Sequence, residues 1–302
     1  MDQIPCWRIV SLLIFTDRNT VLELRWGWDR CMKTGMSEQS DLKAVGEPIK
    51  IESIFVRHRN VLAVRGSFSD LFADYYVHLM DHKIKYEERL DTMLKNSLAT
   101  LTLHLVARPW RETIAWTVNM RAPRINLFVT GGSLNEFITG RIFTEDVREP
   151  DRNLLYSQTL ATAGAEARTS MIEVEGGCPT EWIEHYYEQS EQRPGKCFEL
   201  PNEEFILFAA QPDYDQEWFD SLNEEKALTF LKDEETKVLE TRKFRFHCGC
   251  SVDKILPALA GYKDKPEELF QGDAAIKVQC PRCAASYEIT QEQYIEFNNR
   301  ED

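Results

Sequence analysis

Apolar positions in the first half of the chain follow the two periods of regular secondary structure. Residues 49–55 and 61–66 are short runs rich in β-branched and apolar side chains, which is typical of strands. A helix is expected from residue 69 or 70, a serine and an aspartate that suit a cap, to about residue 78. Residues 86–106 carry leucine and methionine at helical spacing, and Pro109 ends that pattern. The main domain is therefore expected to open with a strand pair followed by two helices.

The middle of the chain predicts mainly strands. Apolar side chains alternate with polar ones from Ile114 to Met120, which indicates a sheet that is buried on one face. Gly131 and Gly132 are expected to form a turn. Strands are expected over 113–120, 124–130, 137–143, 169–174 and 204–210, and a further helix over 180–189. Helices and strands mix without a regular βαβ rhythm, so the expected fold class is α+β.

Residues 1–40 differ from the rest of the chain and are interpreted as an N-terminal extension. They contain tryptophans and cysteines without clear periodicity and end in a polar stretch. Met36 is followed by a polar run that would suit a natural N-terminus. We therefore expect that the part before Met36 comes from a misassigned translation start. The α+β core domain is expected to span residues 41–211.

Residues 212–242 are interpreted as an acidic helical linker. The segment is rich in aspartate and glutamate but keeps enough apolar residues for amphipathic helices. These apolar residues are Trp218, Phe219, Leu222, Leu228, Phe230, Leu231, Val238 and Leu239. Two interpretations remain open: an ordinary acidic pair of surface helices, or a marginal linker whose apolar face needs a neighbour to stay folded.

Four cysteines near the end of the chain have metal-ligand spacing. Cys248 and Cys250 form a C-x-C pair, and Cys280 and Cys283 form a C-x-x-C pair after a spacer. Two local pairs separated by a small fold are what a tetrahedral zinc site requires, and soft thiolates favour zinc over magnesium or calcium. Residues 243–302 have little core of their own, so bound metal would supply much of their folding free energy. We predict a small zinc-binding domain here, ahead of an iron–sulfur cluster or four buried free thiols.

The spacing leaves the role of this zinc site open. Common zinc ribbons use C-x-x-C twice, whereas the tighter Cys248-Gly-Cys250 pair constrains its thiolates and favours release of the metal. Thiolates are also the species that react with oxidants. The residues alone are compatible with a structural staple and with a redox switch.

The remaining histidines and cysteines form no convincing catalytic arrangement, so the protein is not expected to be an enzyme. His78 and His82 have i, i+4 spacing but lack an H-E-x-x-H frame. His247 adjoins the first cysteine pair and is interpreted as a strand or solvent-facing residue, because four thiolates already complete the ligand shell. Cys178 and Cys197 are interpreted as buried free thiols.

Charge and hydropathy exclude several classes of protein. The net charge is −14 and the pI is near 5.0, which argues against nucleic-acid binding because phosphate contacts need a basic face. No segment is long enough to span a bilayer, and the apolar run at 9–15 lacks the flanks of a signal peptide. The 8 cysteines fit a reducing compartment, so the expected location is the cytoplasm.

Two motifs together resemble one family. The first is Cys248-Gly-Cys250-Ser251, then Ile276-Lys-Val278-Gln-Cys280-Pro-Arg-Cys283, then Tyr287. The second runs from Tyr187 to Pro194 and contains an S-E-Q-x-P-like segment, Ser190-Glu-Gln-Arg-Pro194. A weaker third match covers residues 205–212. Together they resemble the redox-regulated heat-shock protein 33 family over about residues 55–300, and the chain is interpreted as a divergent member.

The resemblance implies a chaperone that holds unfolded proteins after oxidation. In the reduced state the four cysteines would hold one zinc ion. Oxidation would form disulfides Cys248–Cys250 and Cys280–Cys283, release zinc, unfold the small domain and free the linker. Unfolded client proteins would then bind, and the oxidised form would be a homodimer. The residues expected to contact clients are Trp218, Phe219, Leu228, Phe230 and Leu231.

Other functions remain as alternatives. The most serious is a zinc-stapled binding or adaptor protein of the same fold without a redox switch, because the linker diverges from the family. A nucleic-acid-binding zinc ribbon has only Lys277, Arg282 and Arg245 in its favour, against the overall negative charge. A thiol oxidoreductase would need C-x-x-C at a helix start, whereas strands are expected on both sides of Cys280 and Cys283.

Overall fold

The computed structural model describes residues 9–15, 21–27, 46–108, 111–161 and 167–300. The chain divides into two compact units. The larger unit comprises residues 43–79 and 85–247, and the smaller unit comprises residues 1–42, 80–84 and 248–302. The expected start at Met36 lies outside the described residues. The boundaries expected for the core domain and the linker stay predictions, and residues 212–242 fall within the larger unit.

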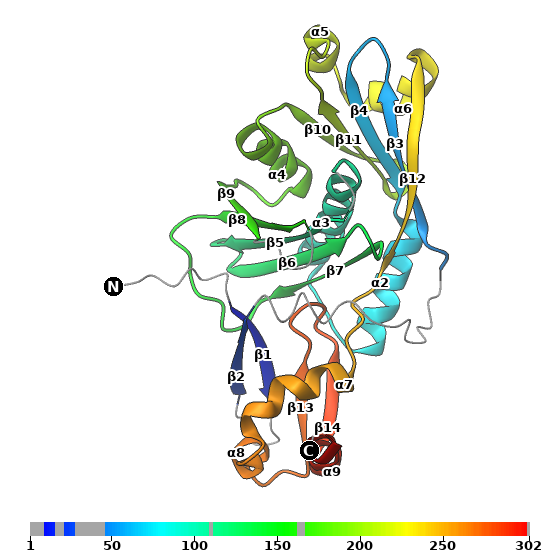
Figure 1. The fold of residues 1–302 in the computed structure, drawn as a ribbon. Coiled ribbons are helices and arrows are strands. Elements are labelled where there is room, and N and C mark those ends of the chain that lie inside the picture. Colours follow the sequence, from blue (N-terminus) through cyan, green and yellow to red (C-terminus); the bar gives the residue numbers. More distant parts are fainter. Residues whose placement is uncertain (1–8, 16–20, 28–45, 109–110, 162–166, 301–302) are drawn as a thin grey trace. The chain divides into compact units, whose positions relative to one another are not determined.

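A ten-stranded sheet in the order β10-β11-β4-β3-β12-β7-β6-β5-β8-β9 forms the larger unit (Figure 1). Neighbouring strands are antiparallel except β12 and β7, which run parallel. The strands are β3 (Ile49–Val56), β4 (Val61–Ser67), β5 (Thr113–Met120), β6 (Ile125–Gly132), β7 (Phe137–Phe143), β8 (Leu154–Leu160), β9 (Arg168–Glu173), β10 (Gly195–Leu200), β11 (Glu204–Ala210) and β12 (Thr236–Phe246). The mixture of this sheet with helices confirms the α+β class.

Helix α3 is the helix around which this unit packs. It runs from Glu88 to Val106, contacts β6 and β7, and is buried on nearly all sides (Figure 1). Its buried hydroxyls are satisfied within the helix, because Ser97, Thr100 and Thr102 each donate at 2.8 Å to a carbonyl four residues earlier. The other helices are α2 (Ser69–Asp81), α4 (Pro179–Tyr186), α5 (Gln216–Asp220) and α6 (Glu224–Asp233), with a π-helical turn at Tyr187–Glu191. No helix among the described residues has both the length and the apolar character needed to cross a membrane.

The expected turn at Gly131 and Gly132 is wrong, because both residues belong to β6. A Cβ atom on Gly131 would lie 2.5 Å from Leu105 Cδ1 and 2.8 Å from Ile138 Cδ1. Glycine is needed at this position so that α3 and β7 can approach the strand. The turn follows instead at residues 133–136.

The acidic segment after β11 is only partly helical. Helices α5 and α6 form where helices were expected. Both have side-chain caps: Asp215 accepts a hydrogen bond from Trp218 N, and Asn223 accepts one from Lys226 N. The expectation of helices is wrong for the end of the segment, where β12 pairs with β3 from Thr236 to Phe244. The buried positions Arg242, Phe244 and Phe246 recur every second residue, which is the period of a strand. Val238 and Leu239 therefore belong to a strand with a bulge.

Helices α5 and α6 cover one apolar face of the sheet. The sheet supplies Ile54, Val56, Val61, Ala63, Leu200, Ile206, Phe208 and Ala210, and the covering segment supplies Phe219, Leu222, Ala227 and Phe230. Phe219 and Phe230 are each 2% exposed, whereas Leu228 on the outer face of α6 is 51% exposed. The apolar half of the acidic segment is thus part of the core of the larger unit.

The smaller unit has a four-stranded antiparallel sheet in the order β14-β13-β1-β2. Its strands are β1 (Ile9–Phe15), β2 (Val21–Gly27), β13 (Ala275–Gln279) and β14 (Ser286–Thr290), and its helices are α7 (Val252–Ile255), a 3-10 helix (Leu256–Tyr262), α8 (Pro266–Phe270) and α9 (Gln291–Arg300). A capping box opens α9: Gln293 N donates to Thr290 Oγ1 at 3.2 Å, and Thr290 N donates to Gln293 Oε1 at 3.0 Å. Ser251 caps α7, because its side chain accepts a hydrogen bond from Lys254 N.

The S-E-Q-x-P-like segment is partly buried and connects the residues after α3 with the far end of the sheet. Glu191 accepts two hydrogen bonds from one nitrogen of Arg108, at 2.6 and 2.8 Å. The same guanidinium contacts Glu112 at 2.7 Å, and Glu112 is only 5% exposed. Ser190 donates to Ser170 on β9 at 2.8 Å. The motif is therefore explained by charges that are buried and paired.

His104 lies at the centre of an aromatic cluster next to this segment. Its side chain is fully buried, its Nδ1 is 3.2 Å from the Tyr187 hydroxyl, and its ring contacts those of Trp116 and Tyr186. Burial lowers the pKa of His104 well below its ordinary value, and the positive charges of Arg108 and Arg193 lower it further. The imidazole is therefore neutral in the folded protein.

We predict that His104 makes the stability of the larger unit depend on pH. The folded state keeps His104 neutral, whereas the unfolded chain takes up a proton below about pH 6.5. The contribution of the neutral His104 to the free energy of unfolding is full above that pH. As the pH falls further, this contribution is lost at up to about 1.4 kcal/mol per pH unit. Urea unfolding, monitored by hydrogen exchange of α3, should show that the free energy of unfolding falls with this slope against pH in the wild type. The slope should be shallower in His104→Gln.

The exposed His185 provides the matched control. Its ring contacts only Gln189 at the surface, so His185→Gln should keep the wild-type slope. An equal slope in His104→Gln and in the wild type would show that His104 does not titrate on unfolding.

Candidate metal centre

Four cysteine sulfurs meet at one end of the smaller unit. Cys280 follows β13 and Cys283 lies in the turn before β14, while Cys248 and Cys250 enter the unit directly after β12. Cys248 Sγ is 3.6 Å from Cys280 Sγ, Cys250 Sγ is 3.5 Å from Cys283 Sγ, and all four sulfurs lie within 4.8 Å of one another. The structure thus brings together the four residues singled out by their spacing.

Both cysteine pairs are held by tight backbone turns. Gly249 has a φ of 68° between Cys248 and Cys250, a conformation that glycine adopts without a steric penalty. Cys280 N donates to Ala285 O at 2.8 Å, and Ala284 N donates to Cys280 O at 3.0 Å. These bonds close the turn that carries Cys280 and Cys283 and aim both sulfurs inward.

The sulfur arrangement fits a tetrahedral metal. Zinc–sulfur bonds of about 2.3 Å place neighbouring sulfurs of a tetrahedral site roughly 3.8 Å apart, close to the observed separations. Among the residues that the structure describes, this is the one group of three or more His, Cys, Asp or Glu side chains close enough to share an ion. The donors are all sulfur, which hard oxygen-seeking cations do not prefer. The cluster could therefore hold a soft or borderline metal ion.

Burial and mutual hydrogen bonding set the electrostatics of the cluster. Cys280 and Cys283 are 3% and 1% exposed, whereas Cys248 and Cys250 are half-buried. Hydrogen bonds from the thiols of Cys248 and Cys250 lower the pKa of Cys280 well below its ordinary value. The site therefore favours a thiolate at Cys280, and thiolates are the form that binds metal.

Tyr287 supports the cluster from outside. Its hydroxyl donates to the Cys250 carbonyl oxygen at 2.9 Å and lies 3.2 Å from Cys250 Sγ. Burial, followed by the nearby Cys250 thiol, raises the pKa of Tyr287, so the phenol stays protonated and able to donate. The ring of His82, which belongs to the same unit, lies 5.8 Å from the Tyr287 ring. Tyr287 and His82 thus form a layer behind Cys250.

The other candidate residues lie apart from this centre. His247 directly precedes the first pair but is not in the ligand group, and its backbone N donates to Ile138 O at 2.9 Å. His78 packs against Phe246. Cys197 is a buried free thiol as expected, whereas Cys178 is free but only half-buried.

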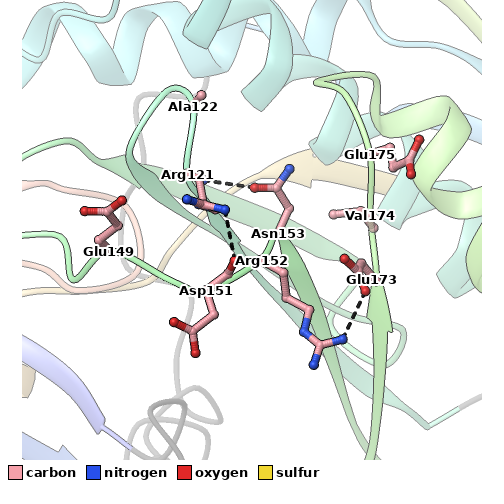
Figure 2. A pocket seen from close by; sticks show the side chains of 9 residues that line it. All are labelled: Arg121, Ala122, Glu149, Asp151, Arg152, Asn153, Glu173, Val174 and Glu175. Atoms are coloured by element: carbon pink, nitrogen blue, oxygen red, sulfur yellow. Dashed lines mark hydrogen bonds and ion pairs between the residues drawn. The ribbon is translucent and has the colours of Figure 1, made fainter.

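A second hollow, of about 550 Å³, lies in the larger unit and is shown in Figure 2. Among its charged side chains, Arg152 pairs with Glu173 at 3.2 Å, and Arg121 donates to the Asp151 backbone carbonyl oxygen at 3.1 Å. Its wall has no cysteine, serine or histidine, and it lacks the convergent ligand atoms of the cysteine cluster. We therefore regard the cysteine cluster as the functional site.

Comparison with known proteins supports the same reading. A family model described as Hsp33 protein matches residues 203–290, which include all four cysteines. The resemblance to the Hsp33 family is confirmed. The 33 kDa chaperonin of Pectobacterium carotovorum is 23% identical over 258 residues, covering 74% of this chain and 88% of that protein. The 33 kDa chaperonin of Bacillus licheniformis is 33% identical over 73 residues, covering 24% of this chain and 25% of that protein.

The fold also matches a solved Hsp33 homologue. The crystal structure of the 33 kDa chaperonin from Thermotoga maritima has a TM-score of 0.63 and covers 84% of this chain and 98% of that chain. The two chains are 14% identical, so this likeness concerns the fold. The two chains therefore share a fold over most of their lengths although few of their residues are identical.

We predict that the Tyr287 hydroxyl strengthens metal binding by the cluster. Groups that hold a metal ligand from outside typically change affinity by about 10- to 100-fold when they are removed. Tyr287→Phe should therefore lose zinc to a chromophoric chelator at correspondingly lower chelator concentrations than the wild type.

Tyr294→Phe is the matched control for this measurement. The buried Tyr294 hydroxyl donates to the Leu259 carbonyl oxygen at 2.9 Å in the same unit, but it does not touch a cysteine. If both variants lose zinc equally, general loosening of the unit explains the effect and the contact with Cys250 does not.

Proposed function

We propose that this protein is a redox-regulated holdase chaperone whose switch is the cluster of Cys248, Cys250, Cys280 and Cys283. The main support for this proposal is that these four sulfurs converge within the segment that matches the Hsp33 family model. The names of the relatives, 33 kDa chaperonin, support a chaperone, and the all-thiolate cluster supports control by oxidation.

Zinc is the proposed metal of the reduced state. A bound zinc ion would supply much of the folding free energy of the smaller unit, because such small domains have limited apolar cores. Its core consists of Ile255, Leu256, Leu259, Leu269, Phe270, Ile276, Val278, Ile289 and Tyr294. The four cysteines hold the two ends of this segment together, so their chemistry decides whether it stays folded.

Oxidation removes the metal-binding thiolates. In the proposed reaction two cysteine thiolates give up two electrons and form one disulfide, while hydrogen peroxide accepts these electrons and, with two protons, leaves as two water molecules. We propose the pairing Cys248–Cys250 and Cys280–Cys283, which the resemblance implies. A disulfide sulfur is a poor metal ligand, so each bond removes two of the four donors.

The chain connects this chemistry to an apolar surface. Strand β12 leads directly into Cys248, and α5 and α6 precede that strand. Both helices are short, and helices of 5 and 10 residues are marginal without a packing partner. We propose that α5 and α6 leave the sheet when order is lost beyond β12.

The surface proposed for client binding has a hidden and an exposed part. Phe219 and Phe230 are buried against the sheet, Trp218 is partly buried, and Leu228 and Leu231 are 51% and 39% exposed. Release of α5 and α6 would uncover the first group and the sheet face beneath it, for which Ile54, Val56 and Phe208 are examples. Such a continuous apolar surface would bind unfolded polypeptides, kept soluble by the acidic flanks.

Several finer properties belong to the same proposal. We propose a homodimer in the oxidised state and a cytoplasmic location, where the thiols would stay reduced until stress. The net charge of −14 supports protein clients over nucleic acid. Binding of clients requires no enzymatic step by this chain.

A zinc-stapled binding protein without a switch is the second candidate. It is favoured by one observation: Phe219 and Phe230 are as deeply buried as the sheet residues that they cover. A segment packed this well would stay in place if the cysteines have only a structural role.

Client aggregation distinguishes the two candidates. The zinc-loaded protein is mixed with a chemically unfolded client before and after peroxide treatment, and light scattering and zinc release are recorded on the same sample. We predict protection only after oxidation and in step with zinc release. If zinc is released but the client still aggregates, the result supports the zinc-stapled binding protein and contradicts the redox-regulated chaperone.

Cysteine variants complete this test. Cys178→Ser removes a half-buried thiol outside the cluster and should leave the switch unchanged. Cys280→Ser should abolish zinc retention under both candidate functions, so only its client protection without oxidant is informative.

A further inference from the structure

The tip of the β3–β4 hairpin contacts the acidic segment on both sides of the two helices α5 and α6. This tip consists of residues 57–60, which lie far from the cysteines in sequence and in a different unit. It contacts residues 211–215, just before α5, and residues 234–235, just after α6. The hairpin therefore closes the loop that contains both covering helices.

One guanidinium makes the central bridge. Arg59 donates to Asp215 Oδ2 at 2.6 Å, and it donates to both oxygens of Glu234, at 2.9 and 3.1 Å. The same guanidinium lies 5.7 Å from the ring centre of Trp218 in α5. Forked pairing of this kind is the strongest type of surface ion pair, because the planar guanidinium matches the carboxylate geometry.

Partial burial adds to the strength of this bridge. The Arg59 side chain is 33% exposed and the Glu234 side chain is 15% exposed, so solvent screens their attraction less than at an open surface. The neighbouring pair Arg57–Glu235 is far more open, with side chains 47% and 56% exposed. Arg59 is therefore the dominant charge in the contact.

Backbone hydrogen bonds set the register of the bridge. Asp215 N donates to Arg59 O at 3.0 Å, Gln211 N donates to Asn60 O at 3.0 Å, and Arg57 N donates to Glu235 O at 2.8 Å. These bonds place both carboxylates opposite the same guanidinium. An unfolded α5–α6 segment would lose the bridge at both ends at once.

We propose that Arg59 is an inhibitory clasp that holds α5 and α6 over the apolar sheet face and controls their release separately from the cysteines. The inference rests on the proposed holdase function and names a second point of control over the same surface. Because the clasp is electrostatic and lies outside the cysteine cluster, its removal lowers the cost of opening without any oxidation.

The core of the larger unit offers a matched ion pair for comparison. Arg65 on β4 contacts Glu204 on β11 at 3.5 Å, and its side chain is 27% exposed. This pair joins two core strands and touches neither α5 nor α6. Arg65→Ala therefore removes a similar charge from the same sheet without unlocking the segment.

The first readout needs no client and no oxidant. Hydrogen exchange of residues 216–233 is measured in the reduced, zinc-loaded wild type, Arg59→Ala and Arg65→Ala, with zinc content checked in each. Loss of charged hydrogen bonds should speed exchange in Arg59→Ala by about 10- to 100-fold, while Arg65→Ala stays near the wild type. Unchanged exchange in Arg59→Ala, or equal acceleration in both variants, would overturn the clasp.

The second readout tests inhibition. Reduced Arg59→Ala should protect an unfolded client without peroxide, whereas the reduced wild type and Arg65→Ala should not. Faster exchange without protection, while the peroxide-treated wild type does protect, would show that the bridge is structural and not inhibitory. If the peroxide-treated wild type also fails to protect, the holdase proposal fails, and the exchange data alone decide whether Arg59 holds the segment.

A double-mutant cycle assigns the effect to the bridge itself. Glu234→Ala removes the forked partner, and the effects of Arg59→Ala and Glu234→Ala on exchange should be strongly non-additive. Additive effects would show that Arg59 acts on the segment by another route and would overturn the proposal.

Discussion

The structure of the smaller unit depends on four sulfurs that lie within 4.8 Å of one another. Two of them precede α7 and two lie in the β13–β14 turn, so they connect the beginning of the C-terminal segment to its β-hairpin. The apolar core beside them is small, and small cores rarely give much stability without a metal or a disulfide. Under the proposed function, oxidation would exchange one set of cross-links for another with a different connectivity. The proposed switch would therefore tie the fold of this unit to the redox state of Cys248, Cys250, Cys280 and Cys283.

The larger unit must store an apolar surface without exposing it. Phe219 and Phe230 complete the core over the sheet, yet they belong to a segment that is mostly acidic on its outer side. Burial of these two rings stabilises the closed form by several kcal/mol at most, because a fully buried aromatic or aliphatic side chain contributes about 1.5–3 kcal/mol. A contribution of that size can be offset by modest changes elsewhere. The packing seen here is thus compatible with a cover that opens.

Sequence reasoning succeeded where the signal was local. Each cysteine pair lies within one turn, and the leucine pattern of α3 lies within one helix. It failed where tertiary contacts decided: Gly131 is in a strand because Leu105 and Ile138 crowd it. The first part of β12 was expected to be helical from its acidic, amphipathic composition, whereas pairing with β3 makes it a strand. The bridge from Arg59 to Glu234 joins residues 175 positions apart, so no short pattern could indicate it.

Two kinds of physical control meet in this chain. Thiol oxidation is a covalent step that is reversed only by reduction, whereas the ion pairs of Arg59 break and re-form freely and weaken with ionic strength. A cover held by both would open more readily when cysteine chemistry removes its continuation beyond β12, and also when the charges at its ends no longer hold it. The ion pairs would then set how far the cover closes again once the cysteines are reduced. Release of a bound client would accordingly depend on Asp215 and Glu234 as well as on the sulfurs.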